Sequence, residues 1–257
     1  MYSGYDRKGE WFQLFQIGFG GIPGKPFGDG ADGHSLWPNF TNVPNEFLEA
    51  YFPLRIETYE TIPDSGGAGR HRGGNALRVA YRFLEPGEIS LHDDRWLTHP
   101  WGVNGGAPGR RSRKELIRAD GTREVLPSKC DRVVVAENDL LLFETWGGGG
   151  WGDPLARDPQ AVARDVRRGL LTRDGADAYG VVLDAADEVD AAATAVRRAA
   201  LAATRPAPAL FSRGGSIEEI KARCLSETGL PPPVLPSARR RPRAASRVAG
   251  APRRGEE

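Results

Sequence analysis

The chain has 257 residues, of which 39% are apolar and 27% charged, so it can form one large or two small domains with a buried core. No apolar run approaches the roughly 20 residues that span a bilayer, which excludes a membrane-spanning protein. The 35 basic and 34 acidic side chains leave a formal charge of +1, which gives the whole molecule no electrostatic reason to bind nucleic acid or acidic membranes. Two cysteines make no disulfide framework and the first residues lack a secretion signal, so we expect a cytoplasmic protein.

Glycine and proline are unusually frequent, with 33 and 20 residues. The glycines gather between strand-like segments, in clusters at residues 18–33, 65–74, 102–109 and 147–152. This distribution indicates tight turns in a loop-rich, β-dominated body.

Residues 1–153 show mostly the period of two that is typical of strands. The clearest run, 77–83, predicts a strand whose apolar face consists of Leu77, Val79, Tyr81 and Phe83. Residues 52–62 alternate in the same way. Asp120-Gly121 predicts a hairpin turn, and residues 133–145 predict two strands around Glu137-Asn138.

After Asp153-Pro154 the period changes to 3.6, which predicts a helical region over residues 154–230. Asp158 is a natural N-cap for a helix with the apolar stripe Val162, Val166 and Leu170, and residues 172–179 predict a further helical turn or two. A third helix is expected over 187–203, with Val189, Val196 and Leu201 as its apolar residues. Ser216 to Glu219 forms a capping box that opens a fourth helix ending before Gly229.

Residues 231–257 contain prolines and seven arginines but almost no apolar anchors, which predicts a disordered basic tail. Such a tail is either a solvated segment without a specific partner or a contact for nucleic acid. We favour the first interpretation and regard nucleic acid as an unlikely partner, because the tail lacks aromatic side chains for base stacking. The expected fold class is therefore α+β: a β-rich, loop-rich body followed by a small helical C-terminal region and a disordered basic tail.

The run Gly147 to Gly152 contains the spacing G-x-G-x-x-G of dinucleotide-binding loops. Its context argues against that function, because the next helix begins only after Asp158 and no βαβ pattern precedes the run. No G-K-[ST] follows a glycine loop anywhere in the chain. We therefore favour a structural role for these glycines and expect no nucleotide site.

Charged loop residues supply the remaining candidates. Asp29, Asp32 and His34 bring two carboxylates and an imidazole within six residues, which suits metal ligation, although a turn with side-chain hydrogen bonds is favoured. His92 can act as a general base oriented by a neighbouring carboxylate, and the loop with Arg70 and His71 can bind an anion. Ser65 and Cys130 fit no nucleophile motif, and charged loops at strand ends are commonplace.

Taken in order, these clusters resemble the hydantoinase B/oxoprolinase family, and the resemblance covers roughly residues 18–235. The segments that carry it are 29–34, 41–46, 51–55, 63–74, 101–109, 127–129, 147–154, 165–170 and 179–183. The family includes N-methylhydantoinase B subunits, the corresponding part of 5-oxoprolinase, and large subunits of acetone and acetophenone carboxylases.

The resemblance implies an ATP-dependent enzyme of several subunits. A hydantoinase A type partner binds ATP and phosphorylates an amide or enol oxygen, and the B type chain holds a divalent metal and helps complete ring hydrolysis or carboxylation. Family B chains have a long N-terminal half that precedes the segment with which this sequence opens, and the associated metal ligands lie in that half. No metal ligand is therefore transferred to this chain, whose metal-binding residues stay unknown.

We accordingly interpret the sequence as the C-terminal portion of a B type chain whose enzyme hydrolyses a small cyclic amide. The alternatives are a subunit of an ATP-dependent ketone carboxylase and a non-catalytic structural remnant of such a subunit. The candidate substrate-side or interface residues are Asp64, Arg70, His71, His92 and Asp94.

Overall fold

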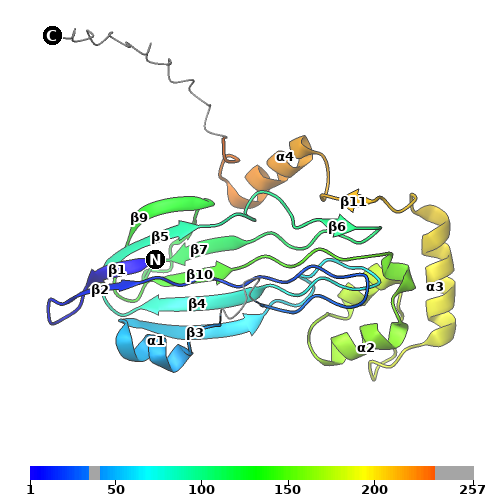
Figure 1. The fold of residues 1–257 in the computed structure, drawn as a ribbon, viewed down its shortest axis with the longest axis horizontal. Helices are drawn as coiled ribbons and strands as arrows, with labels where there is room; N and C mark the ends of the chain where they lie inside the picture. The colour runs from blue at the N-terminus through cyan, green and yellow to red at the C-terminus, as the bar shows by residue number, and fades with distance from the viewer. Residues whose placement is uncertain (35–40, 235–257) are drawn as a thin grey trace, which may run out of the picture.

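The computed structural model describes residues 1–34 and 41–234 (Figure 1). The predicted basic tail from residue 235 onward lies outside the described residues. Within the described parts, strands with one short helix make up the chain before residue 145, and helices with one short strand follow after residue 153. This arrangement confirms the α+β class. Across the same parts, no helix combines the length and the apolar character that crossing a membrane requires.

Two antiparallel sheets form the body. The first has four strands in the order β2 (Trp11–Leu14), β1 (Tyr2–Tyr5), β5 (Gly87–His92) and β9 (Lys129–Val135). The second has five strands in the order β3 (Leu54–Thr61), β4 (Leu77–Phe83), β10 (Leu140–Glu144), β7 (Arg113–Ile117) and β8 (Arg123–Val125). A short helix, α1 (Asn45–Tyr51), precedes β3, and β6 (Gly102–Val103) pairs with β11 (Phe211–Ser212).

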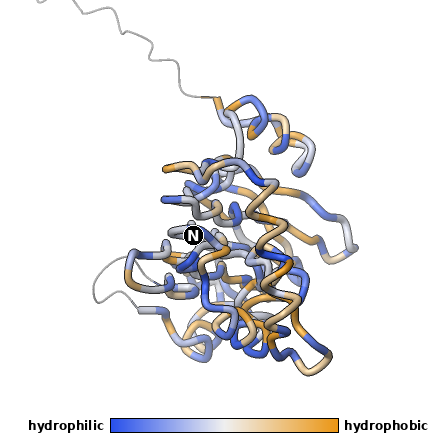
Figure 2. The backbone as a smooth tube through the Cα atoms, turned by 90° about the vertical axis from the view of Figure 1, so that its right-hand side faces the viewer, coloured by the Kyte–Doolittle hydropathy of each residue, from blue (hydrophilic) through white to orange (hydrophobic). Residues whose placement is uncertain are grey.

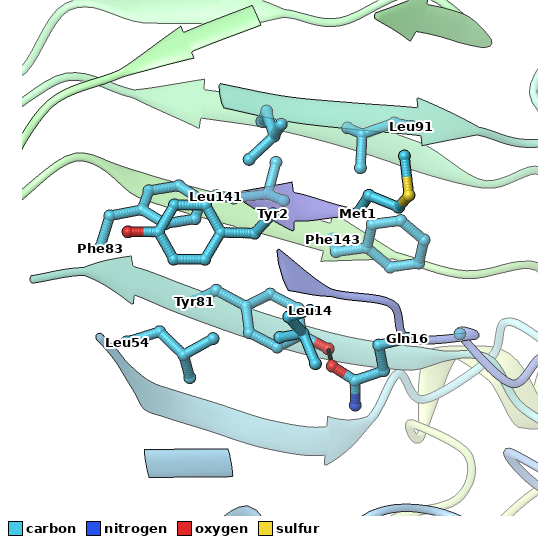
Figure 3. A pocket seen from close by; sticks show the side chains of 12 residues that line it. Met1, Tyr2, Leu14, Gln16, Leu54, Tyr81, Phe83, Leu91, Leu141 and Phe143 are labelled. Atoms are coloured by element: carbon cyan, nitrogen blue, oxygen red, sulfur yellow. Dashed lines mark hydrogen bonds between the residues drawn. The ribbon is translucent and has the colours of Figure 1, made fainter. Parts of the chain in front are cut away.

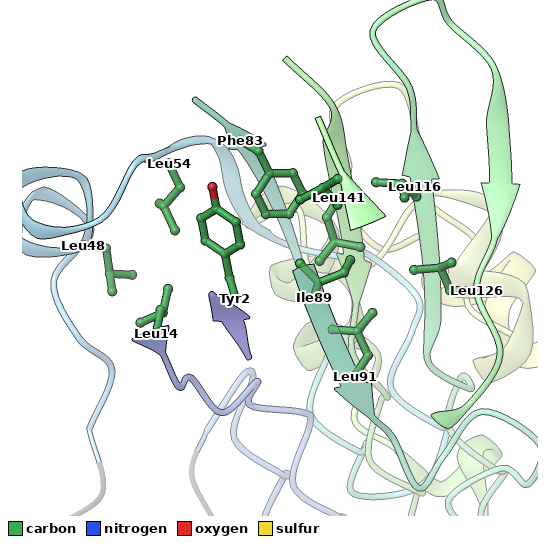
Figure 4. Close-up of a cluster of buried hydrophobic side chains, with 11 residues drawn as sticks. Tyr2, Leu14, Leu48, Leu54, Phe83, Ile89, Leu91, Leu116, Leu126 and Leu141 are labelled. Carbon is green, nitrogen blue, oxygen red and sulfur yellow. The ribbon is translucent and has the colours of Figure 1, made fainter. Parts of the chain in front are cut away.

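The two sheets face each other across one apolar core (Figure 4). Tyr2 and Ile89 from the first sheet meet Phe83 and Leu116 from the second, and Leu48 of α1 joins the same cluster. The Tyr2 ring lies 4.7 Å from the Phe83 ring, and its hydroxyl donates to the Glu85 carbonyl at 2.7 Å, so its polar end is satisfied where its ring is buried.

The predicted strands are present, with one unforeseen feature. In β4, Leu77, Val79 and Phe83 are buried as expected, and the half-buried Tyr81 donates its hydroxyl hydrogen to Gln16 at 3.0 Å. β9 and β10 follow each other around Glu137-Asn138 but belong to different sheets. The left-handed backbone of Asn138, with φ of 70°, lies at this crossing from one sheet to the other.

A small apolar cavity of about 70 Å³ remains between the sheets. Figure 3 shows Leu14, Leu91 and Phe143 among the side chains around it, together with the hydrogen bond from Tyr81 to Gln16. Its volume is close to what one or two water molecules occupy.

Beyond one end of the second sheet the chain continues in extended glycine-rich segments, which we call the glycine bundle: residues 18–33, 65–76, 101–110 and 146–152 (Figure 1). Backbone hydrogen bonds join the segments, including Gly21 N–H to Trp146 O at 2.7 Å and Gly148 N–H to Gly74 O at 2.8 Å. A Cβ atom added at Gly74 would lie 1.8 Å from the Ala31 carbonyl oxygen. Most glycines of these clusters therefore serve close backbone packing rather than the expected turns, and few of them have positive φ.

The first part of the helical region packs on the glycine bundle. It contains α2 (Pro159–Arg167), the 3₁₀ helices η1 (Pro154–Ala156) and η2 (Asp174–Tyr179), α3 (Ala191–Thr204) and α4 (Ile217–Thr228). Asp158 caps α2 as predicted by accepting from Gln160 N–H at 3.0 Å. The predicted capping box of α4 is also formed. A second apolar cluster, centred on Val162 and Tyr179, anchors α2 and η2.

The third helix differs from its prediction. It begins at Ala191 rather than near 187, because Asp190 is its N-cap and accepts from Ala193 N–H at 2.9 Å. Val189 precedes the helix and forms a bridge with Leu183, and Val196 is 72% exposed. The expectation that Val189 and Val196 are packing residues of this helix was therefore wrong. Figure 2, which looks onto this side, shows α3 crossing in front of the remaining chain.

Candidate functional site

A surface hollow of about 380 Å³ lies where the glycine bundle meets η1 and α2. Among its lining residues are Asp29, Arg70, His71, Arg157, Asp158 and Arg164. The structure therefore brings two of the five predicted site residues, Arg70 and His71, together with Asp29, from a segment about forty residues away in the chain.

The backbone of the glycine bundle fixes His71. Its N–H donates to the Trp151 carbonyl at 3.0 Å, and its own carbonyl accepts from Trp151 N–H at 2.9 Å. The two side-chain rings lie 5.8 Å apart with a 34° tilt. His71 Nδ1 is 3.8 Å from Asp29 Oδ1. The imidazole thus has a defined position on the hollow, with one carboxylate beside it.

A charge network lies beside the hollow, and its members Asp29 and Arg157 line it. Arg157 donates to both carboxylate oxygens of Asp29, at 2.6 and 2.7 Å, and to Asp165 Oδ2 at 2.7 Å. Arg72 donates to Asp32 at 2.8 and 3.2 Å, and its Nε lies 3.4 Å from Asp165 Oδ2. Arg72, Arg157 and Asp165 are all at most 5% exposed. Because buried charges are costly unless paired, this network holds the bundle against α2.

The network also sets the ionisation of Asp29. Burial by itself would raise the pKa of this carboxyl group. The hydrogen bonds and charge of Arg157, assisted by the Arg72 backbone N–H and charge, outweigh that effect and lower the pKa below its ordinary value. Asp29 is therefore an anion held by arginine and is a poor proton donor.

The suggested metal ligands do not fit a metal ion. The carboxylates of Asp29 and Asp32 are both bound to arginines, and Asp32 also accepts from Asn75 N–H at 2.6 Å. Across residues 1–34 and 41–234, no group of three His, Cys, Asp or Glu side chains is arranged to hold a metal. The favoured interpretation of the 29–34 segment was a turn with local side-chain hydrogen bonds, but the hydrogen bonds of Asp29 and Asp32 go to residues at least 40 positions away.

Asp64 lies elsewhere and links the bundle to the helical region. Its carboxylate accepts from Thr172 N–H at 2.9 Å and from the Thr172 hydroxyl at 2.6 Å, just before η2. Its backbone is left-handed, with φ of 59°. These contacts give Asp64 a structural task, and it does not line the hollow.

His92 and Asp94 are also separate from the hollow. The carboxylate beside His92 belongs to Asp131, whose Oδ1 is 3.0 Å from His92 Nε2, and Asp94 pairs with Lys129 at 3.0 Å. The adjacent Asp93 points inward instead and pairs with the buried Lys114. Side-chain exposures of 64% for His92 and 88% for Asp94 leave both on the open surface.

The glycine run 147–152 has the structural role that was favoured for it. The N–H groups of Gly147, Gly150 and Gly152 donate to the carbonyls of Arg110, Ala107 and Val103 at 2.9 to 3.0 Å. A phosphate-binding loop needs such groups free. Ser65 is structural too, because its buried hydroxyl donates to Ile62 O and accepts from Ala76 N–H.

Sequence reasoning missed Arg157, Asp165 and Arg164. Arg157 binds Asp29 across 128 residues of chain, and no local pattern marks it. Arg164 stands on α2 at the hollow, opposite the loop with Arg70. Within the described chain, the guanidinium groups of Arg70 and Arg164 have no ion-pair partner. The hollow therefore offers two guanidinium groups without an ion pair and an imidazole, beside a network of two arginines and three carboxylates and the capping carboxylate of Asp158. The two guanidinium groups are the part of the hollow that can bind an anionic group.

Comparison with known proteins identifies the family of this chain. The model of the hydantoinase B/oxoprolinase family matches residues 1–154. The chain belongs to this family. The putative D-/L-hydantoinase B chain of Pseudomonas sp. (strain NS671) is 31% identical over 194 residues, which cover 74% of this chain and 32% of that protein. The acetone carboxylase alpha subunit of Xanthobacter autotrophicus is 32% identical over 202 residues, covering 60% of this chain and 25% of its own.

A solved structure has the same fold. The crystal structure of the ATP-dependent caprolactamase from Pseudomonas jessenii superposes with a TM-score of 0.62 and 27% identity, over 77% of this chain and 36% of that one. The chain thus spans about a third or less of the length of the two sequence relatives. Because both relatives are named as single subunits of their enzymes, relatives of this chain work with partner subunits.

Proposed function

We propose that this chain forms part of the B type subunit of an ATP-dependent enzyme that hydrolyses a small cyclic amide. The observation that carries the proposal is the similarity to the ATP-dependent caprolactamase, which extends over 77% of the chain. The share is large enough to include both the β-rich body and part of the helical region. Membership of the hydantoinase B/oxoprolinase family supports the same reaction class.

In this proposal ATP is bound by a hydantoinase A type partner, and the divalent metal by residues other than the described ones. The described chain contributes the hollow at α2. Its guanidinium groups, Arg70 and Arg164, bind an anionic group of the activated substrate, and His71 donates or accepts a hydrogen bond beside them. The buried Arg157 contributes no charge to this binding because Asp29 and Asp165 already neutralise it.

Ketone carboxylation is the second candidate reaction. The 32% identity with an acetone carboxylase alpha subunit favours it, and that identity is as high as the identity with the hydantoinase relative. A non-catalytic role in the assembly is the third possibility, and it gains support from the structural contacts of Asp29 and Asp64. The three functions differ in what triggers ATP hydrolysis.

The test is co-expression of the chain with an A type subunit and with the remaining segment of a B type chain. We expect a stable complex whose ATP hydrolysis depends on a cyclic amide. Dependence on a ketone and bicarbonate instead would establish carboxylation. ATP hydrolysis that proceeds equally well without this chain, or no complex at all, would contradict the proposal.

Variants of the hollow refine that test. Arg70→Gln and Arg164→Gln should each lower substrate-dependent ATP hydrolysis on the order of tenfold, since each removes one charged hydrogen-bond donor. Arg168→Gln is the matched control, because Arg168 is an exposed arginine at the end of α2 that does not line the hollow. Equal activities for all three variants would remove the hollow from the proposed site.

A further inference from the structure

A second polar pocket, of about 230 Å³, lies between α4, the segment that follows β5, and the start of β7. Figure 1 shows α4 beside the loop that leaves β5. This pocket shares no lining residue with the hollow at α2. No residue of the predicted site belongs to it.

Arginines dominate its lining. Arg110, Arg111 and Arg113 come from the chain entering β7, and Arg223 comes from α4, whereas Glu227 is the one carboxylate among the described lining residues. His99 adds no charge. Its Nδ1 lies 2.8 Å from the Gly109 carbonyl oxygen and so carries a hydrogen, and burial, the largest effect, lowers the pKa of the ring.

Two of the four guanidinium groups are already paired. Arg111 is 8% exposed and binds Glu227, and it also faces the carbonyls of Trp96 and Leu97 at 3.4 and 3.3 Å. Arg110 binds Glu144 at 2.5 Å. This second carboxylate is shared, since Arg78 lies 2.8 Å from its other oxygen.

The other two guanidinium groups are available. Among residues 1–34 and 41–234, the side chains of Arg113 and Arg223 have no hydrogen-bond or ion-pair partner. Arg223 lies one helical turn before Glu227 on the same face of α4. Because Glu227 binds Arg111, this face of α4 is held against the body, and Arg223 is held over the pocket. Ile220 and Cys224, both buried, fix the same helix to the body.

We infer that this pocket binds the oxyanion of a small molecule, either a phosphate or a carboxylate. A recess lined mainly by cations concentrates anions, and a guanidinium group can donate two parallel hydrogen bonds to two oxygens of either a carboxylate or a phosphate. The volume of about 230 Å³ equals roughly eight water molecules at about 30 Å³ each, which admits a small anion and excludes a folded partner.

The identification of phosphate and carboxylate as the two candidate anions rests on the proposed function. ATP-dependent ring hydrolysis consumes two water molecules overall. One converts ATP to ADP and inorganic phosphate. The other gives its hydroxyl group to the ring carbonyl carbon and one proton to the ring nitrogen as the C–N bond breaks, and the carboxylic acid so formed passes its proton to the amine. Either product carries the oxyanion that the pocket recognises.

Calorimetric titration of the full 257-residue chain at low salt tests the inference, with inorganic phosphate in one series and acetate in another. We expect saturable binding of at least one anion, with one site per chain that remains when the hollow is disabled by Arg70→Gln and Arg164→Gln. Arg113→Gln and Arg223→Gln should each weaken that binding on the order of tenfold. Lys221→Gln is the control, because Lys221 is an exposed cation on the same helix outside the pocket.

Phosphate binding alone would assign the pocket to phosphate, and acetate binding alone to carboxylate. Binding that persists unchanged in the double variant Arg113→Gln, Arg223→Gln would overturn the inference, as would failure of both anions to bind the unaltered chain. Circular dichroism of each variant shows that it is folded. Anion binding in an assembly without ATP hydrolysis would preserve this inference while removing the proposed function.

Discussion

The sandwich of two sheets and the glycine bundle hold their segments together by different interactions. In the sandwich, large apolar side chains such as Phe83 and Leu116 fill the space between sheets. In the bundle, glycines such as Gly74 bring backbones into direct contact, and hydrogen bonds between main chains replace side-chain packing. Side chains contribute at the border, where the Arg157 network joins the bundle to α2.

The difference explains why the candidate site lies on the bundle. A sandwich core tolerates a change of apolar side chain if volume is conserved. The glycines of the bundle have no side chain that could adjust, so their backbones are fixed closely against one another. Arg70 and His71 extend their side chains from such a backbone, and main-chain hydrogen bonds to Gly152 and Trp151 hold their backbone atoms in place. The bundle is therefore a rigid support for side chains at its surface.

The largest expected effect comes from adding one methyl group to the bundle. In Gly74→Ala the new Cβ would lie 1.8 Å from the Ala31 carbonyl oxygen, a backbone atom that cannot move alone. We expect the free energy of unfolding to fall by about 5 kcal/mol, enough to unfold many domains. Urea unfolding followed by circular dichroism measures this change.

Gly28→Ala is the control for that experiment, since a Cβ there meets no atom within 4 Å. Its free energy of unfolding should stay within about 1 kcal/mol of the unaltered value. Equal free energies of unfolding for Gly74→Ala and Gly28→Ala would show that the bundle is loosely packed at Gly74.

The next largest effect is expected at the border between bundle and helices. Arg157→Met leaves Asp29 and the buried Asp165 without their shared guanidinium group. The free energy of unfolding should fall by about 3 kcal/mol, because the buried Asp165 then keeps only the Arg72 guanidinium group, at 3.4 Å, as a partner. Arg167→Met, which removes an exposed pair with Glu188, should cost about 0.5 kcal/mol or less. Similar losses in thermal unfolding of both variants would argue against a network that joins the two regions.

The sequence predicted the sandwich better than the bundle. Alternation marks a strand such as 77–83 because one face is buried, and capping residues such as Asp158 and Ser216 mark helix starts locally. Glycine clusters have no periodicity, so they indicated turns where the chain in fact packs extended segments. The pairing of segments such as 65–76 with 146–152 depends on contacts far apart in the chain.

The site was predicted only where one segment contains the chemistry. The basic loop at Arg70 and His71 was visible in the sequence and lies on the hollow. Arg157 was not visible, because its role depends on Asp29, which is 128 residues away. His92 was paired in the prediction with its sequence neighbours, but strand pairing between β5 and β9 places Asp131 beside it.

The smallest effect expected is the dependence of stability on pH at Asp29. Arg157 lowers the pKa of this carboxyl group in the folded chain despite its burial, so between the folded value and the ordinary value near 3.8 only the unfolded chain binds the proton. The stabilisation is therefore complete above pH 3.8 and is lost as the pH falls below that value. Partial exposure of the side chain, 35%, keeps the effect modest.

Asp29→Asn tests this reasoning because it removes the titrating group. The difference in free energy of unfolding between the unaltered chain and the variant should be constant from about pH 6 to 8, where Asp29 is ionised in both states. This difference should shrink as the pH falls from about 4 to 3. Protonation of Asp29 then removes the charge interaction with Arg157 from the unaltered chain, and the variant lacks that interaction at every pH. A difference that stays constant throughout this acid range would mean that Arg157 binds Asp29 only weakly, and that the bundle and α2 are joined mainly through the buried Asp165.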